Sequence, residues 1–100
     1  MTEQSIFSCF VEPDITDSVL DCLLCQPYVS GFSVQQIDGY SKDHASYTVT
    51  EQVAGYRAIC RIDIRLEKSE IHALTSAIKQ LDLQHSIRYW VTPVIEFGSI

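Results

Sequence analysis

Apolar and polar residues follow different periods along the chain, and four segments have the pattern of strands. Residues 6–11 form a nearly continuous apolar run, which indicates a strand buried on both faces. Residues 57–65 alternate between apolar and charged side chains, which predicts a strand with one face of each kind. Residues 32–39 and 87–94 complete the set of predicted strands.

Two further segments repeat their apolar residues at helical spacing, which predicts two amphipathic helices. The first covers residues 15–25, with Asp14 as its N-cap and Pro27 just beyond its end. The second follows Ser69, which we expect to be its N-cap. The apolar stripes consist of Ile15, Val19, Leu20, Leu23 and Leu24 in the first helix and Ile71, Leu74, Ile78 and Leu81 in the second.

The order of these elements predicts a single α+β domain over residues 1–100. Its topology is ferredoxin-like, β-α-β-β-α-β, with a four-stranded antiparallel sheet and two helices on one face. The other face is left uncovered, although the strands carry apolar residues on both faces, including Tyr89 or Trp90. Exposed apolar surface of this kind usually marks an interface, so we expect a closed homo-oligomer.

The connection formed by residues 41–54 is polar and shows neither a helical nor a strand period. Loops this long in a small domain tend to be functional. We therefore predict that it binds a partner protein. The candidate contact residues are Lys42, Asp43, His44, Tyr47 and Glu51.

Composition and charge restrict the kinds of partner. The chain is 46% hydrophobic, which is enough for a core, and its net charge of −6 disfavours nucleic acids and anionic membranes. Its first residues carry no basic patch and only a short apolar run, so we expect no membrane insertion and a cytoplasmic location. The four cysteines should then be reduced thiols.

Two motifs resemble the PII signal-transduction proteins, which are nitrogen regulatory proteins. They are residues 31–40 (GFSVQQIDGY) and residues 88–94 (RYWVTPV), and the loop of residues 41–54 stands where PII proteins carry their mobile partner-binding loop. The resemblance spans most of the chain. The length and pattern are also similar to a PII-like subgroup that is encoded beside heavy-metal efflux pumps.

The resemblance implies a homotrimer whose sheets face inward and whose loops project toward an unidentified partner protein, with a membrane transporter as one candidate. PII proteins hold ATP between subunits with a loop rich in glycine and lysine before the last strand. Here residues 83–87 read LQHSI, without glycine, so we expect neither PII-type ATP binding nor another cofactor. A cleft between subunits, near Gly39, Arg57 and Arg88, could instead hold a small ligand.

A second hypothesis is a metal-binding accessory protein in heavy-metal efflux or tolerance. Cys22 and Cys25 form a CxxC pair within the first predicted helix, and His44 could meet its symmetry mates around a trimer axis. The competing interpretation is two partly buried thiols and an exposed loop histidine, because no second pair completes a tetrahedral site.

Catalysis has no support in the sequence. No serine, histidine and aspartate lie in a recognisable nucleophile motif, and no glycine elbow is present. The chain contains no asparagine, which excludes small ferredoxin-like enzymes that need an arginine and asparagine pair. We therefore expect a protein that is not an enzyme.

Overall fold

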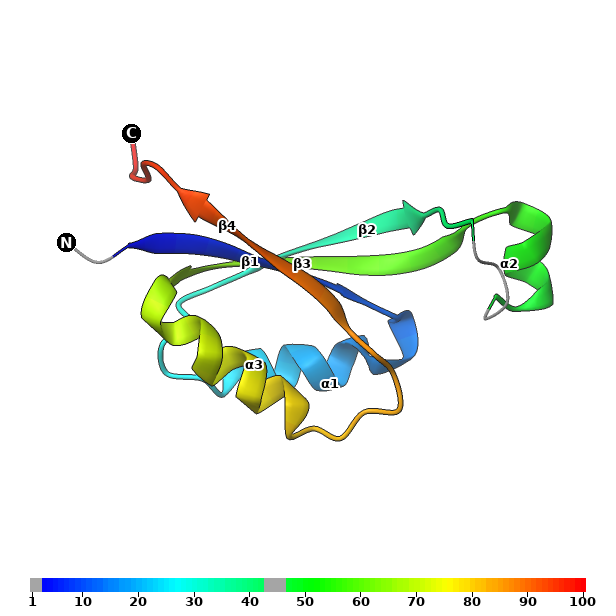
Figure 1. Cartoon of the computed structure of the whole chain (residues 1–100), viewed down its shortest axis with the longest axis horizontal. Helices are drawn as coiled ribbons and strands as arrows, with labels where there is room; N and C mark the ends of the chain where they lie inside the picture. The colour runs from blue at the N-terminus through cyan, green and yellow to red at the C-terminus, as the bar shows by residue number, and fades with distance from the viewer. Residues whose placement is uncertain (1–2, 43–46) are drawn as a thin grey trace.

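The computed structural model describes residues 3–42 and 47–100 as one antiparallel sheet with two long helices against one face (Figure 1). The sheet order is β2-β3-β1-β4, which confirms the predicted ferredoxin-like topology. The strands are β1 (Gln4–Val11), β2 (Ser33–Gly39), β3 (Arg57–Glu67) and β4 (Arg88–Val94). The helices are α1 (Pro13–Leu24), α2 (Val49–Ala54) and α3 (Ile71–Lys79), with a 3-10 turn, η1 (Lys68–Glu70), before α3.

The pairing register decides which side chains meet the helices. Strand β1 lies between β3 and β4, and Phe7 pairs with Ile64 on the face that α1 and α3 cover. The next residue, Ser8, points to the opposite face, where it pairs with Asp63. Each central strand therefore supplies an apolar row to the helices and a more polar row to the uncovered face, which we call the open face.

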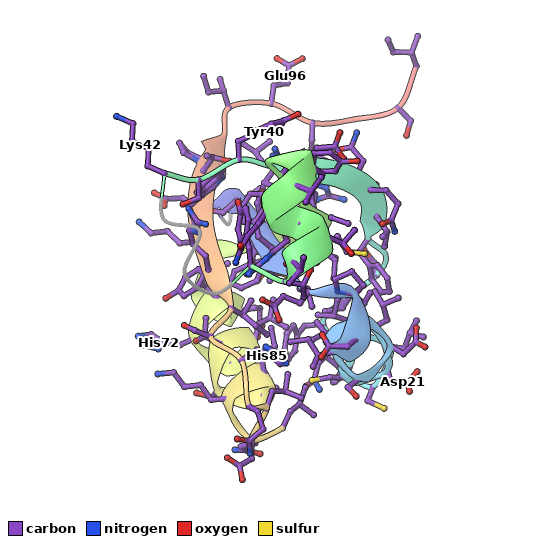
Figure 2. The ribbon with its side chains drawn as sticks, turned by 90° about the vertical axis from the view of Figure 1, so that its right-hand side faces the viewer. Asp21, Tyr40, Lys42, His72, His85 and Glu96 are labelled. Carbon is purple, nitrogen blue, oxygen red and sulfur yellow. The ribbon has the colours of Figure 1, made fainter. Side chains whose placement is uncertain are left out.

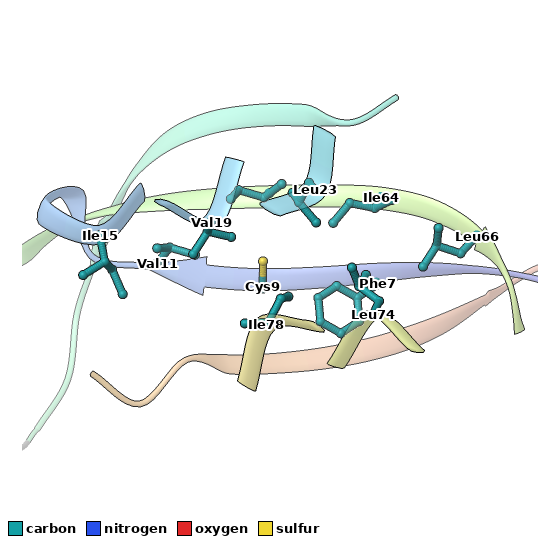
Figure 3. Close-up of a cluster of buried hydrophobic side chains, with 11 residues drawn as sticks. Phe7, Cys9, Val11, Ile15, Val19, Leu23, Ile64, Leu66, Leu74 and Ile78 are labelled. Carbon is teal, nitrogen blue, oxygen red and sulfur yellow. The ribbon is translucent and has the colours of Figure 1, made fainter. Parts of the chain in front are cut away.

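The core lies between the sheet and the helices α1 and α3 (Figure 3). Burying a large aliphatic side chain completely contributes about 1.5–3 kcal/mol, so this cluster is the main source of stability. The core residues are Phe7, Cys9, Val11, Ile15, Val19, Leu23, Ile62, Ile64, Leu66, Leu74 and Ile78.

Both predicted N-caps are wrong. Helix α1 begins at Pro13, and Glu12 takes the extended N-cap conformation that a residue before proline prefers. Asp14 lies in the first turn of the helix, where its charge suits the helix dipole. Ser69 lies inside the 3-10 turn η1, and α3 begins only at Ile71.

The predicted loop is wrong for residues 49–54, which form the short helix α2. Thr48 and Glu51 make a reciprocal capping box at its start, and Gly55 ends it in the left-handed conformation with φ 83°. Helix α2 lies at the far end of the β2–β3 hairpin, away from α1 and α3 (Figure 1).

None of the helices in the described part of the chain has the length and apolar character needed to cross a membrane. The longest described helix, α1, has 12 residues and presents only one side to the core.

The predicted contact residues Asp43 and His44 lie outside the described residues.

Candidate functional site

A pocket of about 250 Å³ lies where the end of β1 meets the beginnings of β3 and β4. Phe10 near the end of β1 pairs with Arg88 of β4 and is flanked on its other side by β3, so the register brings these segments together. Two of the three residues predicted for a ligand cleft, Arg57 and Arg88, line this pocket. The lining consists of Phe10, Val11, Glu12, Arg57, Ile59, Ser86 and Arg88.

Arg57 is held in place by the protein itself. Its Nη1 lies 2.9 Å from the Glu12 carboxylate, and its Nε lies 3.6 Å from that of Glu51 in α2. The guanidinium also lies over the ring of Tyr47, 4.8 Å from its centroid. Arg57 therefore joins the β1–α1 junction to the hairpin end, and its charge is already compensated.

Arg88 is exposed, and no carboxylate in the described ranges 3–42 and 47–100 lies within ion-pair distance of it. The pocket is thus lined by one arginine whose charge is compensated and one whose charge is not, with Ser86 in the same lining. A guanidinium presents paired donors that match a carboxylate or a phosphate. The arrangement suits a small anion.

Gly39, the third residue predicted for the cleft, does not line the pocket. It pairs with Arg57 across the β2–β3 ladder, and its carbonyl oxygen accepts a hydrogen bond of 3.3 Å from the Tyr47 hydroxyl. A Cβ at this position would lie 2.4 Å from Cδ1 of Ile59. A side chain here would require the Ile59 side chain to shift, because its Cδ1 packs directly onto the backbone.

The residues that were predicted to bind a partner lie in different environments at the hairpin end. Tyr47 is only 8% exposed, so its ring packs inside the protein and is not offered to a partner. Lys42 is exposed, and Figure 2 shows it with Tyr40 at the end of the molecule that carries α2. Glu51 is half-buried and is used by the capping box and by Arg57.

Helix α2 itself presents two large apolar side chains to solvent. Val49 is 78% exposed and Val53 is 85% exposed, and their spacing places them on the same side of the helix. Tyr40 is 74% exposed and packs against Tyr56, with 5.7 Å between ring centroids. The hairpin end is therefore an exposed apolar surface, which we call the hairpin tip and define by Tyr40, Val49 and Val53.

The predicted CxxC pair lies at the C-terminal end of α1. Cys22 is half-buried and Cys25 is exposed. Burial raises the pKa of the Cys22 thiol, an effect that outweighs its hydrogen bond with Gln26. The thiolate, which is the form that binds metals, is thus disfavoured at Cys22.

A cluster that the sequence did not predict joins α1 to the loop before β4. His85 Nδ1 lies 2.5 Å from Glu12 Oε2, and His85 Nε2 lies 3.1 Å from Asp14 Oδ2. Glu12 therefore contacts both His85 and Arg57, through different oxygen atoms. No sequence spacing could reveal this cluster, because tertiary folding brings together residues about seventy positions apart.

Comparison with known protein families assigns the chain to one of them. The model of the family described as "Protein of unknown function (DUF3240)" matches residues 1–100. The chain belongs to the DUF3240 family. A DUF3240 family protein from Shewanella baltica OS155 has 26% sequence identity and a TM-score of 0.82, with 100% of this chain and 99% of that chain covered.

The fold is also that of PII-like proteins. CPII from Thiomonas intermedia K12, a nitrogen regulatory PII-like protein, has a TM-score of 0.71 at 14% identity, covering 98% of this chain and 97% of its own. That structure is bound to ADP, AMP and bicarbonate. A second CPII structure, bound to ADP, AMP and acetate, has a TM-score of 0.69 at 13% identity over 93% and 87% of the two chains.

The predicted resemblance to PII proteins is confirmed by this shared fold. No curated protein matches this DUF3240 chain in sequence.

Proposed function

We propose that this DUF3240 protein is a cytoplasmic, homotrimeric regulatory protein that acts on a partner protein through its hairpin tip. It works by binding and not by catalysis. The observation that carries the proposal is the small capped helix α2, which presents Val49 and Val53 to solvent at the end of an extended hairpin.

Exposed valines of this kind can be buried against a partner protein. The chain leaves the pair uncovered, although the capping box and Gly55 hold the helix that carries them. Burying one valine against a partner contributes about 1.5–3 kcal/mol, which is more than an exposed ion pair contributes. The tip is therefore suited to a partner with an apolar groove. A membrane transporter is one candidate, because such a partner could present this groove on its cytoplasmic side.

The open face supports assembly into a trimer. Trp90 on this face is 46% exposed and packs against Phe10, with 4.6 Å between ring centroids. Next to it, Arg61 and Asp63 form an ion pair of 3.2 Å. Aromatic residues and arginine are enriched at protein interfaces, so this face suits burial against other copies of the chain.

The pocket at Arg57 and Arg88 is proposed to hold a small anion instead of ATP bound in the PII manner. The loop before β4 contains no glycine, so side chains keep a triphosphate away from its backbone amides. A carboxylate-sized anion needs only the Arg88 guanidinium and the Ser86 hydroxyl, which share the pocket. CPII offers a parallel, since it is bound to bicarbonate in one structure and to acetate in another.

The test compares capture of partners by the native protein and by the double variant Val49→Asp/Val53→Asp. Both the soluble extract and detergent-solubilised membranes of the source cells are used. The variant Leu24→Asp is a matched control, because Leu24 on α1 is 72% exposed and far from the tip. We expect a partner that binds the native protein and the control but not the double variant.

Two results would contradict the proposal. One is capture of the same proteins by the native chain and by the Val49→Asp/Val53→Asp variant when circular dichroism shows that both are folded. The other is a mass by light scattering that differs from three times the 11.3 kDa of one chain. The first result would disprove the role of the tip, and the second would disprove the trimer.

A further inference from the structure

The imidazole of His85 has a carboxylate oxygen at each of its two nitrogens. Glu12 Oε2 lies 2.5 Å from Nδ1, and Asp14 Oδ2 lies 3.1 Å from Nε2. A neutral imidazole carries only one N–H, so it can donate to only one of these carboxylates. At the other nitrogen a lone pair would face an anionic oxygen, so a positive species, either a second proton or a metal ion, must lie between them.

We propose that this species is a divalent transition-metal ion, bound by His85 Nε2 and the Asp14 carboxylate. Glu12 accepts the Nδ1 hydrogen and fixes the orientation of the ring. Ligand atoms of all three residues lie within 4.8 Å of one another. This site does not depend on the proposed regulatory function, and it differs from the ligands predicted from the sequence, which are His44, Cys22 and Cys25.

The two distances are compatible with a metal ion on one side of the ring only. Zinc binds nitrogen and oxygen at about 2.0–2.2 Å, and at ordinary coordination angles this places two bound atoms about 3.0–3.5 Å apart. The separation of 3.1 Å between His85 Nε2 and Asp14 Oδ2 falls in this range. The separation of 2.5 Å at Nδ1 is too short to contain a metal ion, so the contact with Glu12 is a hydrogen bond.

The surroundings complete the arrangement. The other carboxylate oxygen of Glu12 accepts a hydrogen bond of 2.9 Å from Arg57, so Glu12 cannot rotate freely. A histidine ligand that donates its second ring nitrogen to a fixed carboxylate is the common outer-shell pattern of metal sites. The Asp14 side chain is 65% exposed, which allows an ion to enter and water molecules to complete its coordination.

The donor atoms select the class of ion. One imidazole nitrogen and one carboxylate suit zinc, cobalt and nickel, whereas magnesium prefers a shell made of oxygen atoms alone. The other histidine among the described residues, His72, is exposed on α3, and no carboxylate within the described ranges forms an ion pair with it. Figure 2 shows His72 pointing outward, while His85 lies on the side of the loop that faces α1.

The experiment titrates zinc and cobalt into the full-length protein by isothermal titration calorimetry, in a Cys22→Ser/Cys25→Ser background that removes the competing accessible thiols. We expect His85→Ala and Asp14→Asn to abolish the binding. Glu12→Gln should weaken it by about 10- to 100-fold, as changes of outer-shell partners usually do. His72→Ala is the matched control and should bind the metals as the parent protein does.

A second measurement distinguishes a metal ion from an added proton. In ¹⁵N NMR spectra of the imidazole side chains, excess zinc should shift the Nε2 resonance of His85 and leave Nδ1 protonated. If both nitrogens of His85 remain protonated in excess zinc, the ring is an imidazolium bridging two carboxylates and the proposal is wrong. It is equally wrong if the His85→Ala or His85→Gln variants, shown to be folded, bind zinc as tightly as the parent.

Discussion

The two faces of the sheet are built by the same strands but are completed in different ways. On the face covered by α1 and α3, Phe7, Ile62 and Leu74 are at most 1% exposed. On the open face, Trp90 remains 46% exposed, and Ser8 donates a hydrogen bond of 2.5 Å to Asp63. One face is an apolar core, and the other combines aromatic residues with a satisfied polar network.

This difference separates folding from the proposed assembly. The covered face depends only on removal of apolar side chains from water, and the chain supplies both of its layers itself. On the open face, Ser8, Asp63 and Arg61 are paired with each other, so this part of the face tolerates water. Stability should therefore respond most strongly to changes on the covered face.

The largest effect is expected from Leu74→Ala, which removes a fully buried side chain between α3 and the sheet. The loss should be about 2–5 kcal/mol of unfolding free energy, because the cavity adds to the lost burial. Urea denaturation of the variant and the parent measures it. The exposed Leu24 provides the control, since Leu24→Ala should change the value by less than about 0.5 kcal/mol. Equal losses of stability at Leu74 and Leu24 would contradict the distinction between the buried face and the exposed surface.

A smaller loss is expected from Asp63→Ala on the open face. The change leaves the Ser8 hydroxyl, whose residue is 1% exposed, without its acceptor and removes the partner of Arg61. It should cost about 1–3 kcal/mol by the same urea measurement. Asp63→Asn retains an acceptor for Ser8 and should cost less. An Asp63→Ala loss larger than that of Leu74→Ala would show that the open face controls folding.

The smallest effect is expected in the pH dependence of stability, through the Cys9 thiol. Burial, with a lesser contribution from the Asp63 carboxylate, raises the pKa of the Cys9 thiol to about 12. The unfolded chain loses this proton above about pH 8.5, so the folded protein binds more protons between these values and its stability falls as pH rises. The slope should be at most about 1.4 kcal/mol per pH unit.

Urea denaturation at pH 8, 9 and 10 would measure this slope. The Cys9→Ala variant should lose less stability over the same interval, although its stability at pH 8 is lower. A parallel decline in the two proteins would show that the Cys9 thiol does not couple folding to pH.

Most of the fold could be predicted from periodicity, because the long elements repeat it several times. Residues 57–65 alternate cleanly, and β3 contains all of them. Helix α2 escaped prediction because six residues give only one apolar pair, Val49 and Val53. Its signal is local chemistry, namely the Thr48 and Glu51 capping box followed by Gly55.

The candidate sites were predictable only in part. Arg57 and Arg88 were named together because of the resemblance to PII proteins, and the structure places them in one pocket. The contacts of His85 with Glu12 and Asp14 depend on how the loop before β4 packs against the beginning of α1. Such a contact is set by tertiary packing, and no local spacing in the sequence encodes it.

The two closed ends of α2 have a consequence for recognition. The Thr48 and Glu51 side chains each accept a hydrogen bond from the other residue's backbone N–H at its start, and Gly55 turns the chain at its end, so the tip is preorganised for the proposed partner. A disordered segment must lose much conformational entropy when it binds, which lowers the affinity for a given contact area. A helix held in this way avoids most of that loss, and a small apolar tip can then bind with useful affinity.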